Sequence, residues 1–232
     1  AKSFKSLKVK GIDCHIGSQL HDSEGMKQAF EKIVQCVETL NESGIELECI
    51  NFGGGLGVVY TREHAKNKLA VEKYAELVKN AFKGRKEQVL FEPGRFMVAN
   101  AGILLSRVEY IKDNDIKSFA LIDAGMNDLM RPCLYEAHHE IINCVRKEST
   151  GKVFDVVGPV CESACYLGKK REIPAEQGDL LAVLSAGAYG FTLSSNYNTR
   201  PRPAEVLVDG VESRVIRERE VYEDLWKHEV AA

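Results

Sequence analysis

The spacing of hydrophobic residues divides the first hundred positions into alternating strands and helices. Short apolar runs predict three buried strands, at residues 8–14, 45–50 and 88–91. Apolar side chains that recur at three- and four-residue steps predict two amphipathic helices between them, one beginning at Asp22 or Ser23 and one over residues 68–82. This alternation is typical of an α/β barrel or an open parallel sheet, whose functional residues collect at the carboxyl ends of the strands. Three strands are too few to close a barrel, which needs about eight.

Beyond residue 101 the pattern changes to short, often β-branched runs that are separated by turns. These runs lie at residues 103–111, 119–123, 152–157, 179–184, 204–208 and 213–217. Asp209-Gly210, between the last two runs, is typical of a hairpin turn. We therefore predict two domains: part of an α/β barrel over residues 1–100 and an antiparallel β-domain over residues 101–232.

Four glycines fall within positions 53–57, directly after the second predicted strand. Glycine permits positive φ and close approach to a bound group, so this turn can direct several N–H groups at one anion, usually phosphate. The alternative is a flexible connection. The third predicted strand ends in Glu92-Pro93-Gly94-Arg95, which predicts a second part of the same site. A carboxylate such as Glu92 can keep a pyridinium nitrogen protonated, and a guanidinium such as Arg95 can bind carboxylate or phosphate.

The composition excludes several classes of protein. Hydrophobic residues make up 44% and charged residues 28% of the 232 positions, as in an ordinary globular protein. A net charge of −3 gives no electrostatic signature of nucleic-acid or anionic-membrane binding, and no apolar run reaches the roughly 18 residues of a transmembrane helix. The seven scattered cysteines are typical of reduced thiols in a cytoplasmic protein. Because no second Cys/His pair accompanies Cys161 and Cys165 at zinc-ligand spacing, we expect no metal site.

Two pairs of polar residues are candidates for ligand binding. His15 ends the first predicted strand, with Ser18 three residues further on. The imidazole could lie against an aromatic ring while the hydroxyl donates to phosphate, or His15 could be a structural histidine. Arg131 lies four residues before Tyr135, and this pair suits a substrate carboxylate or belongs to a surface loop.

A thiol and a phenol in the second predicted domain are further candidates. Cys161, next to Glu162, could be a proton donor or nucleophile, or an inert buried thiol. Tyr189 stands among small residues, which predicts a shaped pocket. We interpret His138 and His139 as solvated or capping residues, since no third ligand occurs at a recognisable spacing.

Taken in order, these motifs resemble the diaminopimelate decarboxylases, within the ornithine/arginine decarboxylase group of pyridoxal-phosphate (PLP) enzymes of the alanine-racemase-like fold. The matching segments are residues 15–18, 53–55, 92–95, 131–135, 158–163, 188–189, 202–208 and 216–220. Each segment is short, but the ordered set is specific and covers essentially the whole chain. The form Cys161-Glu162-Ser163, with the paired arginines, favours diaminopimelate over ornithine or arginine as the substrate. The resemblance implies that residues 1–100 are the last βα units of a PLP-binding TIM-type barrel.

The resemblance also implies roles for the candidate residues. The PLP-binding residues would be His15, Ser18, Gly54, Gly55, Glu92, Pro93, Gly94, Arg95 and Tyr189. The substrate-binding residues would be Arg95, Arg131, Tyr135, Glu162 and Tyr189. Cys161 would be the proton donor, and Cys161 and Glu162 would act in the partner subunit's site of a homodimer. The reaction would be the loss of CO₂ from meso-diaminopimelate to give L-lysine, in lysine biosynthesis.

Two departures from the family pattern bear on activity. The family's Schiff-base lysine, in an N-terminal Tyr-Ala-x-Lys-type motif, has no counterpart here, and Cys165 stands where the family usually has Asp. We therefore expect the C-terminal part of an enzyme, inactive and poorly soluble by itself because strand edges are open, with its N-terminal half on a separate or longer polypeptide. The competing hypotheses are a related ornithine, arginine or carboxynorspermidine decarboxylase, and a non-catalytic partner that binds a full-length decarboxylase.

Overall fold

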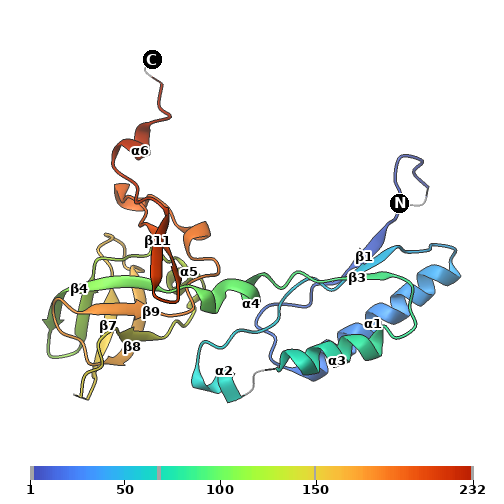
Figure 1. Cartoon of the computed structure of the whole chain (residues 1–232), viewed down its shortest axis with the longest axis horizontal. Coiled ribbons are helices and arrows are strands. Elements are labelled where there is room, and N and C mark those ends of the chain that lie inside the picture. Colours follow the sequence, from blue (N-terminus) through green and yellow to red (C-terminus); the bar gives the residue numbers. More distant parts are fainter. Residues whose placement is uncertain (1–2, 67–68, 149, 231–232) are drawn as a thin grey trace. The chain divides into compact units, whose positions relative to one another are not determined.

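The structure is a computed structural model that describes residues 3–66, 69–148 and 150–230 (Figure 1). The chain divides into two compact units, with the boundary between Val98 and Ala99. Each unit has its own hydrophobic core. The boundary lies close to the change of hydrophobic pattern near residue 100, and the interpretation of residues 1–100 as part of a PLP-binding barrel stays a prediction.

The first unit contains a parallel sheet of three short strands. The strands are β1 (Gly11–Asp13), β2 (Cys49–Asn51) and β3 (Gln88–Leu90), in the order β1-β2-β3. In the registered pairs, Asp13 lies beside Asn51 and Asn51 beside Leu90, so the three carboxyl ends are level. The functional consequence is that the segments following the three strands begin at one edge of the sheet.

Two amphipathic helices contribute apolar side chains to the hydrophobic core of this unit. Helix α1 (Ser23–Glu42) begins at the N-cap Asp22, whose carboxylate accepts hydrogen bonds from the N–H groups of Glu24 and Gly25 at 3.0 and 2.9 Å. The second helix, α3, covers Val71–Ala81, and the predicted start at residue 68 lies outside the described residues. The buried side chains are Met26, Phe30, Ile33, Val37, Leu47, Ile50, Phe52, Leu56 and Leu69. Two single-turn helices complete the unit, α2 (Arg62–Lys66) and α4 (Gly94–Val98).

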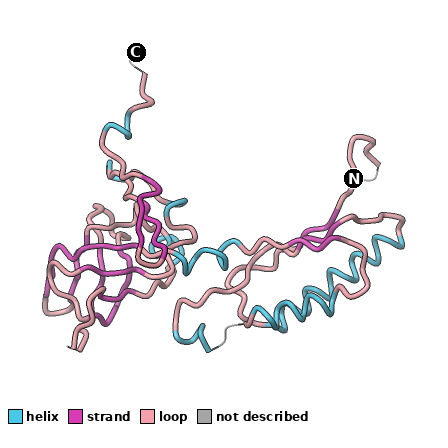
Figure 2. The backbone as a smooth tube through the Cα atoms, viewed as in Figure 1, coloured by secondary structure: helices cyan, strands magenta, loops and turns pink. Residues whose placement is uncertain are grey.

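The second unit begins with a 3₁₀ turn, Ala99–Ala101, and is built on a six-stranded sheet in the order β6-β9-β4-β5-β7-β8. The strands are β4 (Leu104–Asp113), β5 (Ser118–Ile122), β6 (Ile141–Asn143), β7 (Lys152–Val157), β8 (Tyr166–Ile173) and β9 (Leu180–Val183). Figure 2 shows these strands in magenta. β6 and β8, at the two ends of this order, also contact each other, so the sheet is nearly closed.

The prediction of an antiparallel domain is only partly correct, because β5 and β7 pair in parallel and make the sheet mixed. The polypeptide between these strands runs through α5 (Arg131–Tyr135) and β6 before it returns, which is long enough for a parallel crossover. The pattern did not predict β6 or β8. β6 has only three residues, and the centre of β8 is the charged run Lys169-Lys170-Arg171-Glu172.

The hairpin predicted at Asp209-Gly210 is present, formed by β10 (Glu205–Asp209) and β11 (Glu212–Arg217). It is followed by a short helix, α6 (Glu223–Trp226), and preceded by two 3₁₀ turns, Phe191–Leu193 and Tyr197–Thr199. Among the residues that the structure describes, no helix combines the length and apolar character needed to cross a bilayer.

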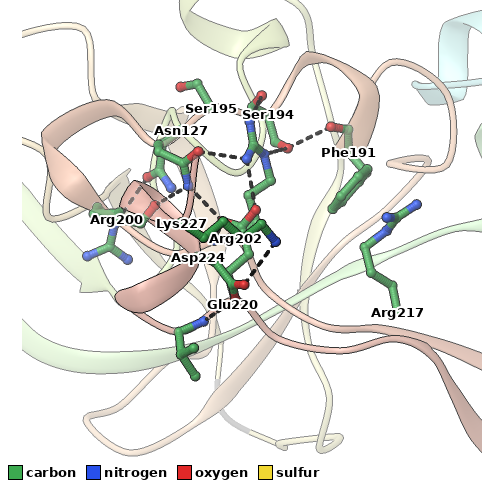
Figure 3. A network of polar contacts seen from close by, with 12 residues as sticks. Asn127, Phe191, Ser194, Ser195, Arg200, Arg202, Arg217, Glu220, Asp224 and Lys227 are labelled. Atoms are coloured by element: carbon green, nitrogen blue, oxygen red, sulfur yellow. Dashed lines mark hydrogen bonds and ion pairs between the residues drawn. The ribbon is translucent and has the colours of Figure 1, made fainter. Parts of the chain in front are cut away.

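A network of hydrogen bonds ties the segment before the hairpin to the segment after it (Figure 3). Glu220 accepts a hydrogen bond from the Arg202 N–H at 2.7 Å and pairs with the Arg202 guanidinium at 2.9 Å. Arg202 also donates to Ser194 Oγ at 3.0 Å, and Arg200 donates to Asn127 Oδ1 at 3.2 Å. Burial opposes ionisation of Glu220, but the hydrogen bonds from Arg202 and Asn196 outweigh it and lower the pKa of this carboxyl.

We expect Glu220→Gln to lower the free energy of unfolding of the second unit by about 1–3 kcal/mol at pH 7, because it removes the charge that faces Arg202. A carboxyl whose pKa is lowered in the folded state contributes stability above its unfolded pKa, and this contribution is lost as pH falls through the folded value. The difference between variant and parent should therefore shrink as the pH falls below 4.5, the ordinary pKa of glutamate. Urea unfolding between pH 3 and 7 measures it, with the exposed Glu218→Gln as control. Equal losses in both variants would contradict the role of the network.

Candidate functional site

Each of the three parallel strands is followed by predicted site residues. His15 and Ser18 follow β1, the glycine turn at residues 53–55 follows β2, and residues 92–95 follow β3. Because the strand ends are level, these segments meet at the carboxyl edge of the sheet. The structure thus brings together the residues of the first unit that the sequence predicted as one site.

The glycine turn is packed tightly against its two neighbouring segments. A Cβ atom added at Gly54 would collide with the carbonyl group of Glu92, and one added at Gly55 would collide with that of Gly17. Gly53 has φ of 60°, and an added Cβ would lie 2.7 Å from His15 Nδ1. This packing, rather than flexibility, explains why glycine is required, and it places the backbone N–H groups of the turn beside His15.

His15 and Asn51 order this turn by side-chain hydrogen bonds. The Nδ1 atom of His15 accepts from the Gly54 N–H at 3.3 Å. Asn51 Oδ1 accepts from the Gly53 N–H at 2.9 Å, while Asn51 Nδ2 donates to Glu92 Oε1 at 2.7 Å. One amide therefore holds the glycine turn and orients the Glu92 carboxylate. The sequence analysis gave Asn51 no role, although it stands at the end of the second predicted strand.

Arg95 reaches back to the other two segments. Its guanidinium donates to Ser18 Oγ at 3.4 Å and to the Tyr60 hydroxyl at 3.2 Å. Tyr60 is buried, and its loop is held by Gln19, whose amide accepts from the Val58 N–H and donates to the Val58 carbonyl, both at 2.9 Å. Sequence reasoning missed Gln19 and Tyr60, because neither side chain is near Arg95 along the chain.

In the second unit, Arg131 and Tyr135 lie at opposite ends of the single-turn helix α5. Arg131 is only 5% exposed, whereas Tyr135 is largely exposed. Helix α5 packs against β8, which starts directly after the turn that contains Cys161 and Glu162. These two predicted groups are therefore neighbours. The Cys133 thiol in α5 has its pKa raised by burial, with smaller effects from Cys165 and Glu162, as expected of adjacent segments.

The turn at residues 158–165 places two cysteines in contrasting environments. Hydrogen bonds from the Glu162 N–H to the Val160 carbonyl at 2.8 Å and from the Cys165 N–H to the Glu162 carbonyl at 2.9 Å shape the turn. Cys161 is exposed, so its thiol is accessible. The alternative interpretation of Cys161 as an inert buried thiol is therefore wrong. Cys165 is 4% exposed and packs beside Gly158, so here it is an apolar core residue. Tyr189 is exposed and has φ of 57°, a left-handed conformation, within the turn that follows β9.

The interpretation of His139 as a solvated or capping residue is wrong. His139 has no exposed surface, and its Nε2 atom lies 2.7 Å from Arg131 Nη1. The signal that could have shown this is its position two residues before Ile141, the buried first residue of strand β6, because alternate residues of an extended segment face the same side. His138 is partly exposed and contacts Arg171 and Glu140 at 2.7 and 3.3 Å. Within residues 3–66, 69–148 and 150–230, no group of three His, Cys, Asp or Glu side chains is arranged to hold a metal ion.

Residues 16–187 match the pyridoxal-dependent decarboxylase family in its C-terminal sheet domain. The chain therefore belongs to this family, as its ordered motifs predicted.

Among individual proteins, the chain is 46% identical to the diaminopimelate decarboxylase of Pseudomonas fluorescens, over 99% of this chain and 54% of that protein. It superimposes on a crystal structure from Aquifex aeolicus with a TM-score of 0.93 and 44% identity, covering 97% of this chain and 56% of the other. A Helicobacter pylori diaminopimelate decarboxylase complexed with L-lysine gives a TM-score of 0.88 at 40% identity, covering 98% and 56%. The chain thus spans about half the length of these relatives.

The residues at the carboxyl edge of the first unit fit PLP. The Ser18 hydroxyl and the Arg95 guanidinium are donors of the kind that a phosphate requires, and the glycine turn has no side chains to keep a bound group away from its backbone. Glu92 supplies the carboxylate that a pyridinium nitrogen requires, and Asn51 holds it.

We expect Gly54→Ala to destabilise the first unit by about 1–3 kcal/mol, because the new methyl group must displace the Glu92 carbonyl and force the ends of β2 and β3 apart. Gly25→Ala is the matched control. Its Cβ would stand 3.4 Å from Asp22 Oδ2, an ordinary contact, and alanine favours the helix by about 0.5–1 kcal/mol. Urea unfolding of the two variants measures the difference. Equal stability of both variants would contradict the close packing of Gly54 against the Glu92 carbonyl.

Proposed function

We propose that this chain is the C-terminal portion of a PLP-dependent decarboxylase that converts meso-diaminopimelate to L-lysine and CO₂. The observation that carries the proposal is the convergence of the glycine turn, Glu92, Arg95 and Ser18 at one edge of the parallel sheet. The choice of substrate is supported by the names of the relatives at 44–48% identity. They are diaminopimelate decarboxylases.

In this proposal, the first unit binds the cofactor. Ser18, Gly54 and Gly55, with the backbone groups of Gly94 and Arg95, hold the phosphate. His15 lies against the ring, and Glu92 keeps its pyridine nitrogen protonated. Bound PLP supplies the electron sink that stabilises the carbanion left by the loss of CO₂. The hydrogen bond from Asn51 to Glu92 keeps the carboxylate oriented for this task.

The second unit binds the substrate and supplies a proton. Within this unit, Arg131 binds carboxylate, Tyr135 and Tyr189 donate hydrogen bonds, and Glu162 binds an ammonium group. Arg95 of the first unit also binds carboxylate. Tyr189 also contacts the cofactor.

Cys161 transfers its thiol proton to the carbon that has lost CO₂, and the thiolate is then reprotonated from water. The exposure of Cys161 and Glu162 suits action in the partner subunit's site of a homodimer.

The Schiff-base lysine would come from the N-terminal half that the longer relatives possess. We propose a cytoplasmic enzyme on the basis of the seven cysteines, which are all free.

We expect the chain alone, mixed with PLP and reduced with borohydride, to show no stoichiometric adduct by intact-mass analysis. Mixed or fused with the N-terminal half of a close relative, it should release CO₂ from meso-diaminopimelate and form L-lysine. Activity only on ornithine, arginine or carboxynorspermidine would assign the chain to a related decarboxylase. If the two halves form a stable complex that acts on none of these substrates, the chain is better explained as a non-catalytic partner. A stoichiometric PLP adduct with the chain alone would show that it carries its own Schiff-base lysine and would contradict its interpretation as an incomplete enzyme.

In the complete enzyme, we expect Cys161→Ala to lower kcat about 10²–10⁴-fold, because general acid catalysis contributes about this factor. PLP absorbance and KM should change little, since the proton transfer follows binding. Cys144→Ala, which removes another exposed thiol of the same unit, is the control and should retain activity. A Cys161→Ala enzyme with parental kcat would remove this residue from the mechanism.

A further inference from the structure

His139 joins two segments of the second unit that carry proposed substrate residues. Its Nε2 atom lies 2.7 Å from Arg131 Nη1, at the start of α5, and its Nδ1 atom lies 2.9 Å from the carbonyl oxygen of Leu184. Leu184 directly follows β9 and begins the turn that leads to Tyr189. The imidazole is thus a bridge between Arg131 and the base of the Tyr189 turn.

The two partners determine the protonation state of this imidazole. The Leu184 carbonyl can only accept a hydrogen bond, so Nδ1 carries a proton, and the guanidinium can only donate, so Nε2 offers its lone pair. His139 is wholly buried, and this burial is the largest cause that lowers the pKa of its imidazole to about 4. The hydrogen bond to the Leu184 carbonyl raises the pKa, but the positive charges nearby, Arg131 foremost, lower it further. The ring is therefore neutral, with one defined tautomer.

A neutral acceptor has a consequence that a carboxylate partner would not have. A carboxylate would orient the guanidinium and also cancel its charge, whereas an imidazole orients it and leaves the positive charge in place. Arg131 is 95% buried, so its guanidinium can meet a ligand in one defined direction only if the side chain is held in a single conformation. The neighbouring pair, Arg171 with His138 at 2.7 Å, adds a second positive charge to the same region.

We infer that His139 is a positioning residue, which acts through Arg131 to hold a positively charged guanidinium ready for the carboxylate of an amino-acid ligand. This inference deepens the proposed function and rests on the assignment of Arg131 to substrate binding. It predicts that the loss of His139 weakens binding of ligands that carry the carboxylate and leaves binding of the corresponding amines unchanged.

Two substitutions separate the two hydrogen bonds of the imidazole. In His139→Asn, the short amide can still reach the Leu184 carbonyl but not Arg131. In His139→Gln, the longer amide places its oxygen where Nε2 accepts from Arg131. The control is His138→Gln, at the adjacent, partly exposed position that contacts Arg171 instead.

The first measurement uses the chain as it is. The ¹⁵N shifts of the His139 ring, assigned by comparison with His139→Asn, should show protonated Nδ1 and unprotonated Nε2 from pH 6 to 8. A ring that titrates in this range, or the opposite tautomer, would overturn the inference irrespective of any catalytic activity.

The second measurement uses the enzyme completed with its N-terminal half and loaded with PLP. The affinity for L-lysine is compared with that for the 1,5-diamine that lacks the carboxylate. We expect His139→Asn to lower the ratio of the two affinities about tenfold, with His139→Gln restoring most of it and His138→Gln leaving it unchanged. A parental ratio in His139→Asn, or equal weakening of both ligands, would overturn the inference. Failure of the parent enzyme to bind L-lysine would instead overturn the proposed function. In that case the ¹⁵N measurement of the His139 tautomer would still test the contact between His139 and Arg131.

Discussion

The parallel pairing of β1, β2 and β3 with level carboxyl ends is the constraint on which the candidate cofactor site depends. Parallel register places the segments after all three strands at one edge, and their backbones approach so closely that a methyl group does not fit at Gly54 or Gly55. The same packing lets one amide, Asn51, bond to both the glycine turn and Glu92. Backbone packing and side-chain orientation therefore have a common origin here.

In the second unit, polar side chains that each have several hydrogen-bond partners connect segments that lie outside the six-stranded sheet. Arg202 and Glu220 join the residues on either side of the β10–β11 hairpin, and His139 joins α5 to the end of β9. Such groups are buried or half-buried, so their hydrogen bonds must be satisfied together or the segment loses its conformation. This explains how segments outside the sheet can hold Arg131 and the Tyr189 turn in defined positions.

Much of the secondary structure could be predicted from hydrophobic spacing. Helix α1 and its cap at Asp22, the three parallel strands and the β10–β11 hairpin were all visible, because each depends on local period or turn chemistry. Strands β6 and β8 were not, since one is very short and the other is charged at its centre. The parallel pairing of β5 with β7 was also missed, because the direction of a pairing depends on the crossover and not on the strand sequences.

By itself, the sequence determined the family, through an ordered set of short motifs, and the chemical types of the site residues, since a carboxylate, a guanidinium and a thiol limit what a site can do. Only the tertiary structure decided which of these groups are neighbours. Arg95 with Tyr60, and Arg131 with His139, pair across folded segments, and the burial of His139 decided that its imidazole is neutral. The physical reason is that sequence patterns report on local geometry, whereas the protonation and orientation of a side chain depend on partners and on the exclusion of water, which only the folded chain provides.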